Sequence, residues 1–300
     1  MSEQDNTRPW TPGVAPVAVV MISLNEAHNM EAVLANLEGW AQEVFLVDSY
    51  SADETVDIAL RHGVHVAQRR FRGFGDQWNF ALRELPITAP WTMKLDPDER
   101  LSDVLKNNLG DAMRRGDVNS FTINIRLWFM GRQLPLRMKN FTRVWRTGAC
   151  HFSSVMVNEH PLVNGASTHV TGDIEHHDSP NLEHWLHKQN KYTTAEAVSA
   201  WRGDALSVEP RLFGSPLQRR MWLKKNFYRL PCRYVALFLY YWLLQGAWRA
   251  GRAGYIWARL RADVMRIIEY KVVEMKLSGR VGGPLVMGNG SPDQRVSQHE

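Results

Sequence analysis

The feature that most limits the fold is an alternation of apolar runs with helix-like segments in the first third of the chain. The apolar runs occupy residues 17–24, 44–47, 64–67 and 91–95. Between them, residues 27–40 and 55–59 space their apolar side chains as a helix does. A strand, a turn and a helix therefore follow one another repeatedly, and this order predicts a parallel sheet covered by helices.

Polar side chains follow these runs at the points where the predicted strands end. They are Asn25, Glu26, Asp48, Asp96 and Asp98. Ligands of parallel α/β sheets bind beyond the carboxyl ends of the strands. The positions of these side chains predict a nucleotide site at that edge.

Asp96 and Asp98 stand one residue apart, directly after the apolar run 91–95. Because side chains on an extended segment alternate with period two, the two carboxylates can point the same way. Such a pair suits Mg²⁺ or Mn²⁺, which prefer oxygen ligands and keep waters and phosphate oxygens in their other positions. A solvated acidic turn is the alternative when this short stretch is taken alone.

Several motifs together resemble a known family. The stretches "ISLNEAHNM", "VDSYSADETVDIA", "FRGFGDQWNFAL" and "LDPDER" are followed in order by "RVWRTG", "VNEHP", "IEHHD" and "KQNKY". They resemble the successive motifs of family 2 glycosyltransferases with the GT-A fold, and are most similar to the subgroup of bacterial lipopolysaccharide core glucosyltransferases. The likeness runs from about Val17 to Ser278. Pro97, Ala27 and Glu54 depart from the usual pattern.

The resemblance implies an α/β fold with a GT-A-like, mostly parallel sheet flanked by helices, and a C-terminal helical appendage. It also implies transfer of a sugar from a nucleotide-diphosphate donor, typically a UDP-sugar, with inversion at the anomeric carbon. The implied acceptor is a saccharide, either lipopolysaccharide core or another glycolipid.

The resemblance places a donor pocket at the strand ends. Asp48 corresponds to the family's acid beside the uracil, where a carboxylate can accept a hydrogen bond from the base or ribose. Helix capping is the alternative for Asp48 and the preferred interpretation for Asp53. Asn25 and Glu26 are implied to shape the same pocket. The residues implied to approach the diphosphate are Arg69, Arg70 and Arg72, the turn Gly73-Phe74-Gly75, and Gln77 with Asn79.

Asp98 is the preferred direct metal ligand, with Asp96 contacting metal-bound water or ribose and Glu99 as a supporting partner. An inverting transfer also needs a base that takes the proton of the acceptor hydroxyl. The family's acid corresponds to Glu159. An ion pair with the arginines of "RVWR" is the alternative role for Glu159, and its competitors as the base are Asp173, Glu175 and Asp178.

Two further residues are implied as ligand contacts at the donor site. His176 corresponds to a family histidine that contacts the diphosphate or the metal, with a plain hydrogen-bonded histidine as the alternative. Lys188 is a candidate phosphate contact. Zinc is not expected, because the histidines lack zinc-site spacing and Cys150 and Cys232 lie far apart.

Length and composition suit one catalytic domain with an appendage. The chain has 300 residues, of which 44% are hydrophobic, enough for a substantial core. The expected organisation is a flexible N-terminus (1–15), a GT-A-like domain (16–205), a basic, aromatic-rich helical region (206–278) and a flexible tail (279–300). The polar N-terminus predicts a cytoplasmic chain with reduced cysteines.

The helical region combines Arg and Lys with Trp and Tyr. Its apolar run 234–244 is shorter than the roughly 20 residues that a membrane-spanning helix needs. The composition fits an amphipathic segment at an anionic membrane surface, on the inner face of the cytoplasmic membrane. The alternative is that Tyr240, Tyr241 and Trp242 belong to the core or to a dimer interface. The formal net charge of +5 leaves nucleic acid as a weaker option, and none is expected because no binding motif accompanies it.

Two rival functions remain at this level. One is a non-catalytic scaffold subunit that keeps the nucleotide pocket and associates with a membrane. The other is a nucleotidyltransferase, which is disfavoured because "SLNEAHN" lacks the Gly-rich loop that usually follows the first strand.

Overall fold

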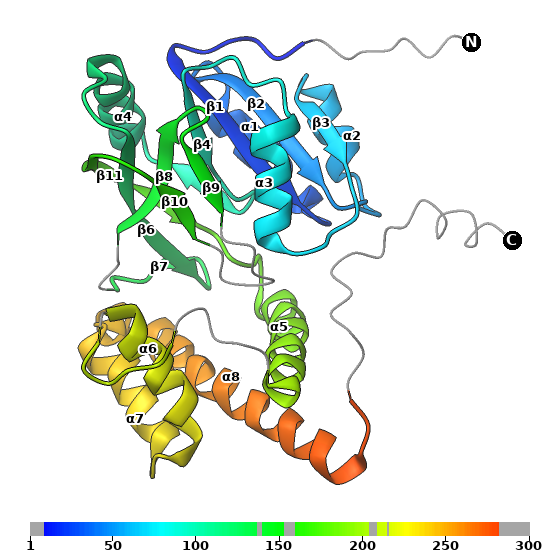
Figure 1. Cartoon of the computed structure of the whole chain (residues 1–300), viewed down its shortest axis with the longest axis vertical. Helices are drawn as coiled ribbons and strands as arrows, with labels where there is room; N and C mark the ends of the chain where they lie inside the picture. The colour runs from blue at the N-terminus through cyan, green and yellow to red at the C-terminus, as the bar shows by residue number, and fades with distance from the viewer. Residues whose placement is uncertain (1–8, 137–139, 153–159, 204–208, 215, 282–300) are drawn as a thin grey trace, which may run out of the picture. The chain divides into compact units, whose positions relative to one another are not determined.

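The computed structural model describes residues 9–136, 140–152, 160–203, 209–214 and 216–281. The chain divides into two compact units. Among the described residues, the first consists of those from 9 to 126 and from 140 to 177, and the second of those from 127 to 136 and from 178 to 281. Each unit is described by itself below (Figure 1).

The first part of the chain alternates strands and helices as the sequence predicts. The elements are β1 Ala15–Ser23, α1 Ala27–Leu37, β2 Ala41–Asp48, α2 Thr55–Arg61, β3 His65–Gln68, α3 Phe74–Glu84, β4 Trp91–Lys94, β5 Glu99–Leu101 and α4 Asp103–Arg115. The four predicted strands and the two predicted helices are therefore confirmed, with ends shifted by a few residues.

The remaining elements are strands followed by helices. The strands are β6 Ser120–Phe129, β7 Arg132–Gln133, β8 Asn140–Arg146, β9 Cys150–Phe152, β10 Pro161–Val163 and β11 Ser167–His176. The helices are α5 Leu182–Arg202, α6 Pro216–Asn226, α7 Arg233–Leu239 and α8 Gly251–Ser278, with 3₁₀ helices η1 Phe227–Arg229 and η3 Ala247–Ala250 and a π-helix η2 Tyr240–Leu244.

The main sheet is mixed. Its strand order is β3-β2-β1-β4-β8-β6-β11-β5, with β7 paired to β6. Strands β3, β2, β1 and β4 pair in parallel, as expected from the alternation. From β4 onward the pairs β4–β8, β6–β8 and β5–β11 are antiparallel. The GT-A-like sheet is therefore built from a parallel half and an antiparallel half.

The parallel half of the sheet is buried on both faces, and successive residues of its strands belong to different core clusters. In β1, Val17 and Val19 belong to one core cluster, whereas Ala18 and Val20 belong to the other. The first cluster is completed by apolar residues of α1 and α4, and the second by Trp78 and Ala81 of α3. Continuous apolar runs are typical of strands that are buried on both faces.

Local signals fix the helix that leads out of the acidic turn. Ser102 caps α4, where its hydroxyl accepts a hydrogen bond from the Leu105 amide at 3.3 Å, and Gly116 ends the helix in the left-handed conformation. Ser102 also accepts a hydrogen bond from the Asp173 amide at 3.2 Å, which ties α4 to β11. At Gly172 the backbone of β11 approaches α4 so closely that a Cβ atom would lie 2.5 Å from the Leu105 Cα.

The second unit has two apolar clusters of its own. One joins Phe129 and Leu134 of the 127–137 segment to Trp185 of α5 and to Trp257 and Ala258 of α8. The other joins Ala197 and Val198 of α5 to Ile268 and Met275 of α8. Within this unit α5 and α7 both lie against α8 (Figure 1). None of the helices among the residues described is long and apolar enough to span a bilayer.

Candidate functional site

The acidic turn after β4 is held by a neighbouring arginine. The amide of Glu99 donates to the carbonyl of Asp96 at 2.9 Å, which closes the turn. Arg100 donates to the carbonyl of Pro97 at 2.6 Å and to that of Asn29 in α1 at 3.0 Å. The turn is therefore fixed to α1, which starts beside the first strand end.

Pairing of β5 with β11 brings a histidine to this turn. In the antiparallel register His176 lies opposite Glu99, and the amide of His177 donates to the carbonyl of Asp98 at 2.8 Å. The Nε2 atom of His176 lies 3.2 Å from an oxygen of Asp98, a carboxylate that is only 6% exposed. Asp98 and His176, both in the first unit, are candidate metal ligands.

Glu99 lies on the inner side of the turn in an ion pair with Arg143 of β8. An Arg143 nitrogen contacts a Glu99 oxygen at 2.6 Å, and a second contacts Asp96 at 3.4 Å. The other Glu99 oxygen accepts from the Asp96 amide at 2.9 Å. Burial raises the pKa of Glu99 to about 7, and the Arg143 charge opposes that rise. Glu99 and Arg143 are both buried, so this pair supports the turn from inside the sheet.

Asp96 has a different electrostatic environment. Burial opposes its ionisation, but the positive charges of Lys94 and Arg143 outweigh this and hold the pKa of Asp96 below its usual value. The ammonium of Lys94 lies 3.9 Å from an Asp96 oxygen and 4.5 Å from the centre of the Trp78 ring. Asp96 is therefore an ionised carboxylate between two cations.

Sequence reasoning missed Lys94, and it considered the "RVWR" arginines only as partners of Glu159. The sequence does contain a signal for Lys94, because a lysine at the end of a buried strand extends its ammonium group toward the solvent at the edge of the sheet. For Arg143 no local signal existed. Its contact with Glu99 depends on the antiparallel position of β8 beside β4, which joins residues far apart in the sequence.

Asp48 ends β2 and organises the loops around it. Its carboxylate is fully buried and accepts from the Ser23 hydroxyl at 2.9 Å, from the Ser51 amide at 2.8 Å, from the Ser51 hydroxyl, and from the Gln68 amide group at 3.0 Å. A carboxylate has about four acceptor positions. These four donors fill them, so a hydrogen bond from a ligand base to Asp48 requires one donor to move.

Asn25 and Glu26 lie at the end of β1, beside this loop. Asn25 adopts a positive φ of 56°, its amide donates to the Ser51 hydroxyl at 2.8 Å, and its side-chain oxygen accepts from the Ala52 amide at 2.8 Å. Glu26 accepts from the Asn29 side chain at 2.8 Å. The two strand ends after β1 and β2 are therefore linked directly.

Asp53 acts at two helix starts. One carboxylate oxygen accepts from the Thr55 amide at 3.1 Å, at the first residue of α2. The other accepts from the Ala27 amide at 3.1 Å, at the first residue of α1. These contacts confirm the helix-capping interpretation of Asp53.

The residues implied to approach the diphosphate differ in their surroundings. Gln77 is fully buried and donates to the Ser49 hydroxyl at 3.3 Å, whereas its oxygen lacks a hydrogen-bond donor among the residues described. Asn79 forms two hydrogen bonds with the backbone of Phe152, at 2.9 and 2.8 Å, so its amide group connects α3 to β9. Arg72 is exposed at the start of α3. The structure therefore brings Gln77 to the end of β2 and gives Asn79 a structural contact.

The predicted base, Glu159, lies outside the residues described. The competing acids are each paired: Asp173 with Arg126 at 2.6 Å, Glu175 with His177 at 3.4 Å, and Asp178 with Lys188 at 2.9 Å. The "RVWR" arginines also have partners, since Arg143 contacts Glu99 and Arg146 donates to the carbonyl of Val118 at 3.4 Å. Lys188 lies on α5 in the second unit, and its ammonium is held by Asp178.

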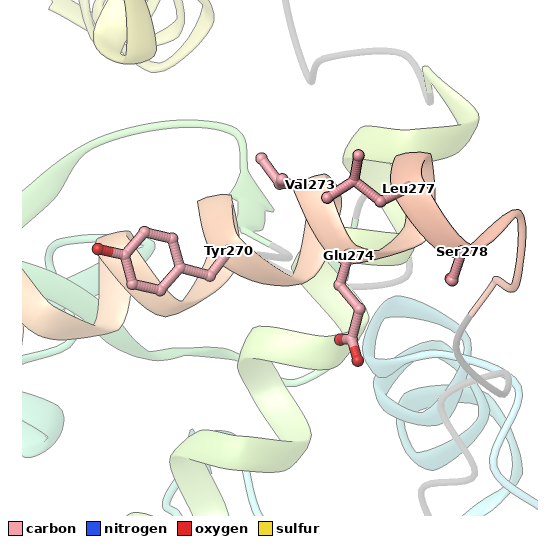
Figure 2. A pocket seen from close by; sticks show the side chains of 5 residues that line it. All are labelled: Tyr270, Val273, Glu274, Leu277 and Ser278. Carbon is pink, nitrogen blue, oxygen red and sulfur yellow. The ribbon is translucent and has the colours of Figure 1, made fainter.

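A shallow pocket lies on the exposed side of α8. Its lining residues are Tyr270, Val273, Glu274, Leu277 and Ser278, all from one helix (Figure 2). None of the predicted site residues is among them. A hollow formed along a single helix does not bring together residues from several elements, as a donor site requires.

The mixed sheet and the acidic turn at the end of β4 define a glycosyltransferase fold of the GT-A type. The chain belongs to glycosyl transferase family 2, whose family model matches residues 18–193. This confirms the resemblance inferred from the motifs.

The chain is also similar to proteins named as glycosyltransferases. The chain is 25% identical to the lipopolysaccharide core biosynthesis glycosyltransferase LpsC of Rhizobium meliloti (strain 1021), over 80% of this chain and 86% of that protein. It is 23% identical to an uncharacterized glycosyltransferase of Rickettsia prowazekii (strain Madrid E), over 60% and 66% of the two chains.

Among solved structures, TarS residues 1–349 of S. aureus match with a TM-score of 0.39 and 13% identity, over 88% of this chain and 92% of that chain. Glucosyl-3-phosphoglycerate synthase of Mycobacterium tuberculosis, in a complex with Mn²⁺ and UDP, matches with a TM-score of 0.30 and 20% identity. That match covers 38% of this chain and 44% of the synthase.

Proposed function

We propose that the protein is an inverting glycosyltransferase that moves a sugar from a UDP-sugar to a saccharide acceptor in lipopolysaccharide core or another glycolipid. The observation that carries this proposal is the acidic turn, where Asp98 meets His176 at 3.2 Å and Glu99 meets Arg143 at 2.6 Å. The similarity to LpsC supports the choice of acceptor.

The donor side chains fit a divalent cation. The carboxylate of Asp98 suits Mn²⁺ or Mg²⁺ with substrate phosphate oxygens in the other positions, and the imidazole of His176 is a nitrogen ligand that Mn²⁺ accepts more readily than Mg²⁺. Asp98 and His176 would hold the ion directly, with Asp96 as a contact to its water or to the ribose. When bound, the cation neutralises charge that develops on the leaving diphosphate. Lys94 and Arg143 keep Asp96 ionised, and Arg143 also holds Glu99 behind the turn.

The donor's nucleoside is proposed to lie against the ends of β1 and β2. Asp48 positions Ser51, and Ser51 in turn accepts from the Asn25 amide, so the loop around the base has one defined shape. Gln77 contributes a buried oxygen for which the described part of the chain supplies no donor, and this oxygen fits a hydroxyl or N–H group of the bound nucleotide sugar. Arg72, Asn79 and Lys188 stay proposed donor contacts on the strength of the family resemblance.

Glu159 is proposed as the base that takes the acceptor proton. This assignment is supported by the surroundings of two other candidate bases, because Asp173 contacts Arg126 and Glu175 contacts His177. The reaction is proposed to occur at the inner face of the cytoplasmic membrane, where a lipid-linked acceptor is available. The boundaries 16–205 for the catalytic domain and 206–278 for the helical region also stay proposals.

The test is a panel of nucleotide sugars, each measured for thermal stabilisation with and without Mn²⁺ and for slow hydrolysis with water as the acceptor. A ligand that binds only the native state raises the apparent stability by mass action. We expect one UDP-sugar to stabilise the protein and to be hydrolysed only with the metal, and Glu159→Gln to abolish sugar transfer while keeping stabilisation by the donor. Stabilisation without any turnover would instead identify a scaffold subunit.

A further inference from the structure

One side of the short helix α7 and of the π-helix η2 that continues it is apolar and exposed. This surface, here called the α7 outer face, consists of Val235, Leu239, Tyr240, Leu243 and Leu244. Their exposed fractions run from 41% at Tyr240 to 62% at Leu244. No charged residue occurs from 234 to 244. Isolated exposed leucines are common, but a continuous apolar strip along one side of a helix marks a contact surface.

The opposite side of the same helix already has its partners. Phe238 and Trp242 each contact the ring of Tyr255 edge-on, with ring centres 5.5 and 5.4 Å apart, and Tyr241 contacts Trp257 at 5.2 Å. The helix is therefore anchored to α8 by its inner side and remains apolar on its outer side. A helix that is apolar all round is usually buried in protein or in lipid.

The charge around this surface indicates which occupant fits. Residues 216–262 contain ten Arg and Lys and no Asp or Glu. Arg229 precedes the α7 outer face, and Arg249 and Arg252 follow it, and all three are exposed. A second copy of the chain would bring cations against cations, whereas an anionic lipid surface offers opposite charge.

We propose that the α7 outer face docks on an anionic lipid bilayer, parallel to its surface. Leu239, Leu243 and Leu244 enter the boundary of the acyl chains, Tyr240 lies at headgroup level, and the flanking arginines contact the lipid phosphates. This inference rests on the proposed function in one respect: a membrane contact would give the enzyme access to a lipid-linked acceptor.

The test is flotation of the full-length protein with vesicles of phosphatidylcholine alone or mixed with phosphatidylglycerol. We expect binding to the anionic vesicles and little to the neutral ones. The double variant Leu243→Gln/Leu244→Gln should lower the binding at least about tenfold, because both leucines lose apolar burial in the lipid. The control is Tyr270→Gln/Leu277→Gln, which changes apolar residues beside Glu274 on α8 that are at least as exposed as Leu243 and Leu244, and it should leave binding unchanged.

Hydrolysis of the soluble donor separates this inference from the proposed function. Hydrolysis should be equal in the wild type and in both double variants, since none of the changed residues belongs to the donor site. Vesicle binding without donor hydrolysis would contradict the proposed function and still support the docking surface. Equal flotation of the two double variants would overturn the docking surface. A second outcome would also overturn it: the wild type is a dimer, Leu243→Gln/Leu244→Gln is a monomer, and neither protein binds vesicles.

Discussion

Two aspartates one residue apart have different neighbours, and this difference separates their roles. Asp98 lies beside the imidazole of His176, whereas Asp96 lies between Lys94 and Arg143. Removing the charge of Asp98 deprives the turn of its proposed metal ligand, whereas Arg100 beside it keeps Glu26 and Glu99 as charged neighbours. We therefore expect Asp98→Asn to lose at least about 100-fold of its metal-dependent donor hydrolysis and to keep a cooperative thermal transition close to that of the wild type. Unchanged hydrolysis in the variant would exclude a metal role for Asp98.

Arg143 has the opposite balance, because its loss leaves a buried carboxylate without its partner. Breaking a buried ion pair from one side costs about 3–5 kcal/mol, so Arg143→Leu should be strongly destabilised in urea unfolding with a chelator present. Without Arg143 the pKa of Glu99 rises further, and the folded state then binds a proton that the unfolded state releases. Stability of the variant should therefore fall as pH rises above the ordinary glutamate value.

The control for Arg143 removes both partners. Arg143→Leu/Glu99→Gln should recover part of the lost stability and show a weaker dependence on pH, because no buried charge remains at Glu99. If the single and double variants unfold at the same urea concentration at every pH, the ion pair does not support the turn.

At the residue scale the sequence predicted the acids of the site better than their partners. Asp48, Asp96 and Asp98 follow apolar runs, and a strand end is visible in the sequence. Arg143 and the fourfold engagement of Asp48 were not predictable, because they depend on contacts across the sheet and between loops. Glu159 stays a prediction.

Among the elements, the parallel half of the sheet was predictable and the antiparallel half was not. Runs such as 17–24 are buried on both faces, so they stand out as continuous apolar stretches. Strands β6, β8 and β11 are partly exposed, and their side chains give no such run. The register that places His176 opposite Glu99 joins residues far apart in the chain, and local patterns do not specify it.

The crossing of β11 over α4 depends on one glycine. Gly172 has a φ of 121°, and a Cβ there would lie 2.5 Å from the backbone of Leu105. Gly172→Ala should therefore lower the free energy of unfolding by at least about 2 kcal/mol, from backbone strain and from the forced shift of α4. Gly110→Ala, in the interior of α4 where only the Arg114 side chain is near, should instead stabilise the helix by up to about 1 kcal/mol. Chemical denaturation of both variants measures the contrast, and equal effects would refute the close packing.

Hydrogen bonds to the carboxylate of Glu269 join α7 to α8 in the second unit. Arg233 donates two hydrogen bonds of 2.7 Å to Glu269, and the Tyr234 hydroxyl donates to the same carboxylate. The hydrogen bond from Arg233 lowers the pKa of Glu269. A carboxylate whose pKa is lowered by folding stabilises the folded state at pH values above the ordinary glutamate pKa. This stabilisation is lost as the pH falls through the folded-state pKa. In chemical denaturation Glu269→Gln should therefore be less stable than the wild type at neutral pH and approach it in acid, whereas Glu274→Gln on the same helix should match the wild type at neutral pH.

Over the whole molecule, the division into units does not follow the order of the chain. Residues 127–137 belong to the unit formed mainly by helices, and this unit starts again at Asp178. The sequence predicted a basic helical region after residue 205 from its composition. The packing of Phe129 and Leu134 with α8 has no signal in composition, because it joins segments more than a hundred residues apart.

This packing determines what a shortened chain should do. A chain that ends at residue 205 keeps all described residues of the two sheet clusters, but it loses Ala247, Trp257 and Ala258 from the cluster around Trp185. Phe129, Leu134 and Trp185 would then face water, and apolar area exposed in this way costs about 25 cal/mol per Å². We expect the shortened protein to bind a hydrophobic dye strongly and to aggregate. A chain that ends after residue 281 retains every described member of both helical clusters, so it should stay monodisperse and bind as little dye as the full chain. A soluble, dye-free protein of residues 1–205 would mean that the sheet and α5 form a domain without the later helices, as the boundary at 205 supposes.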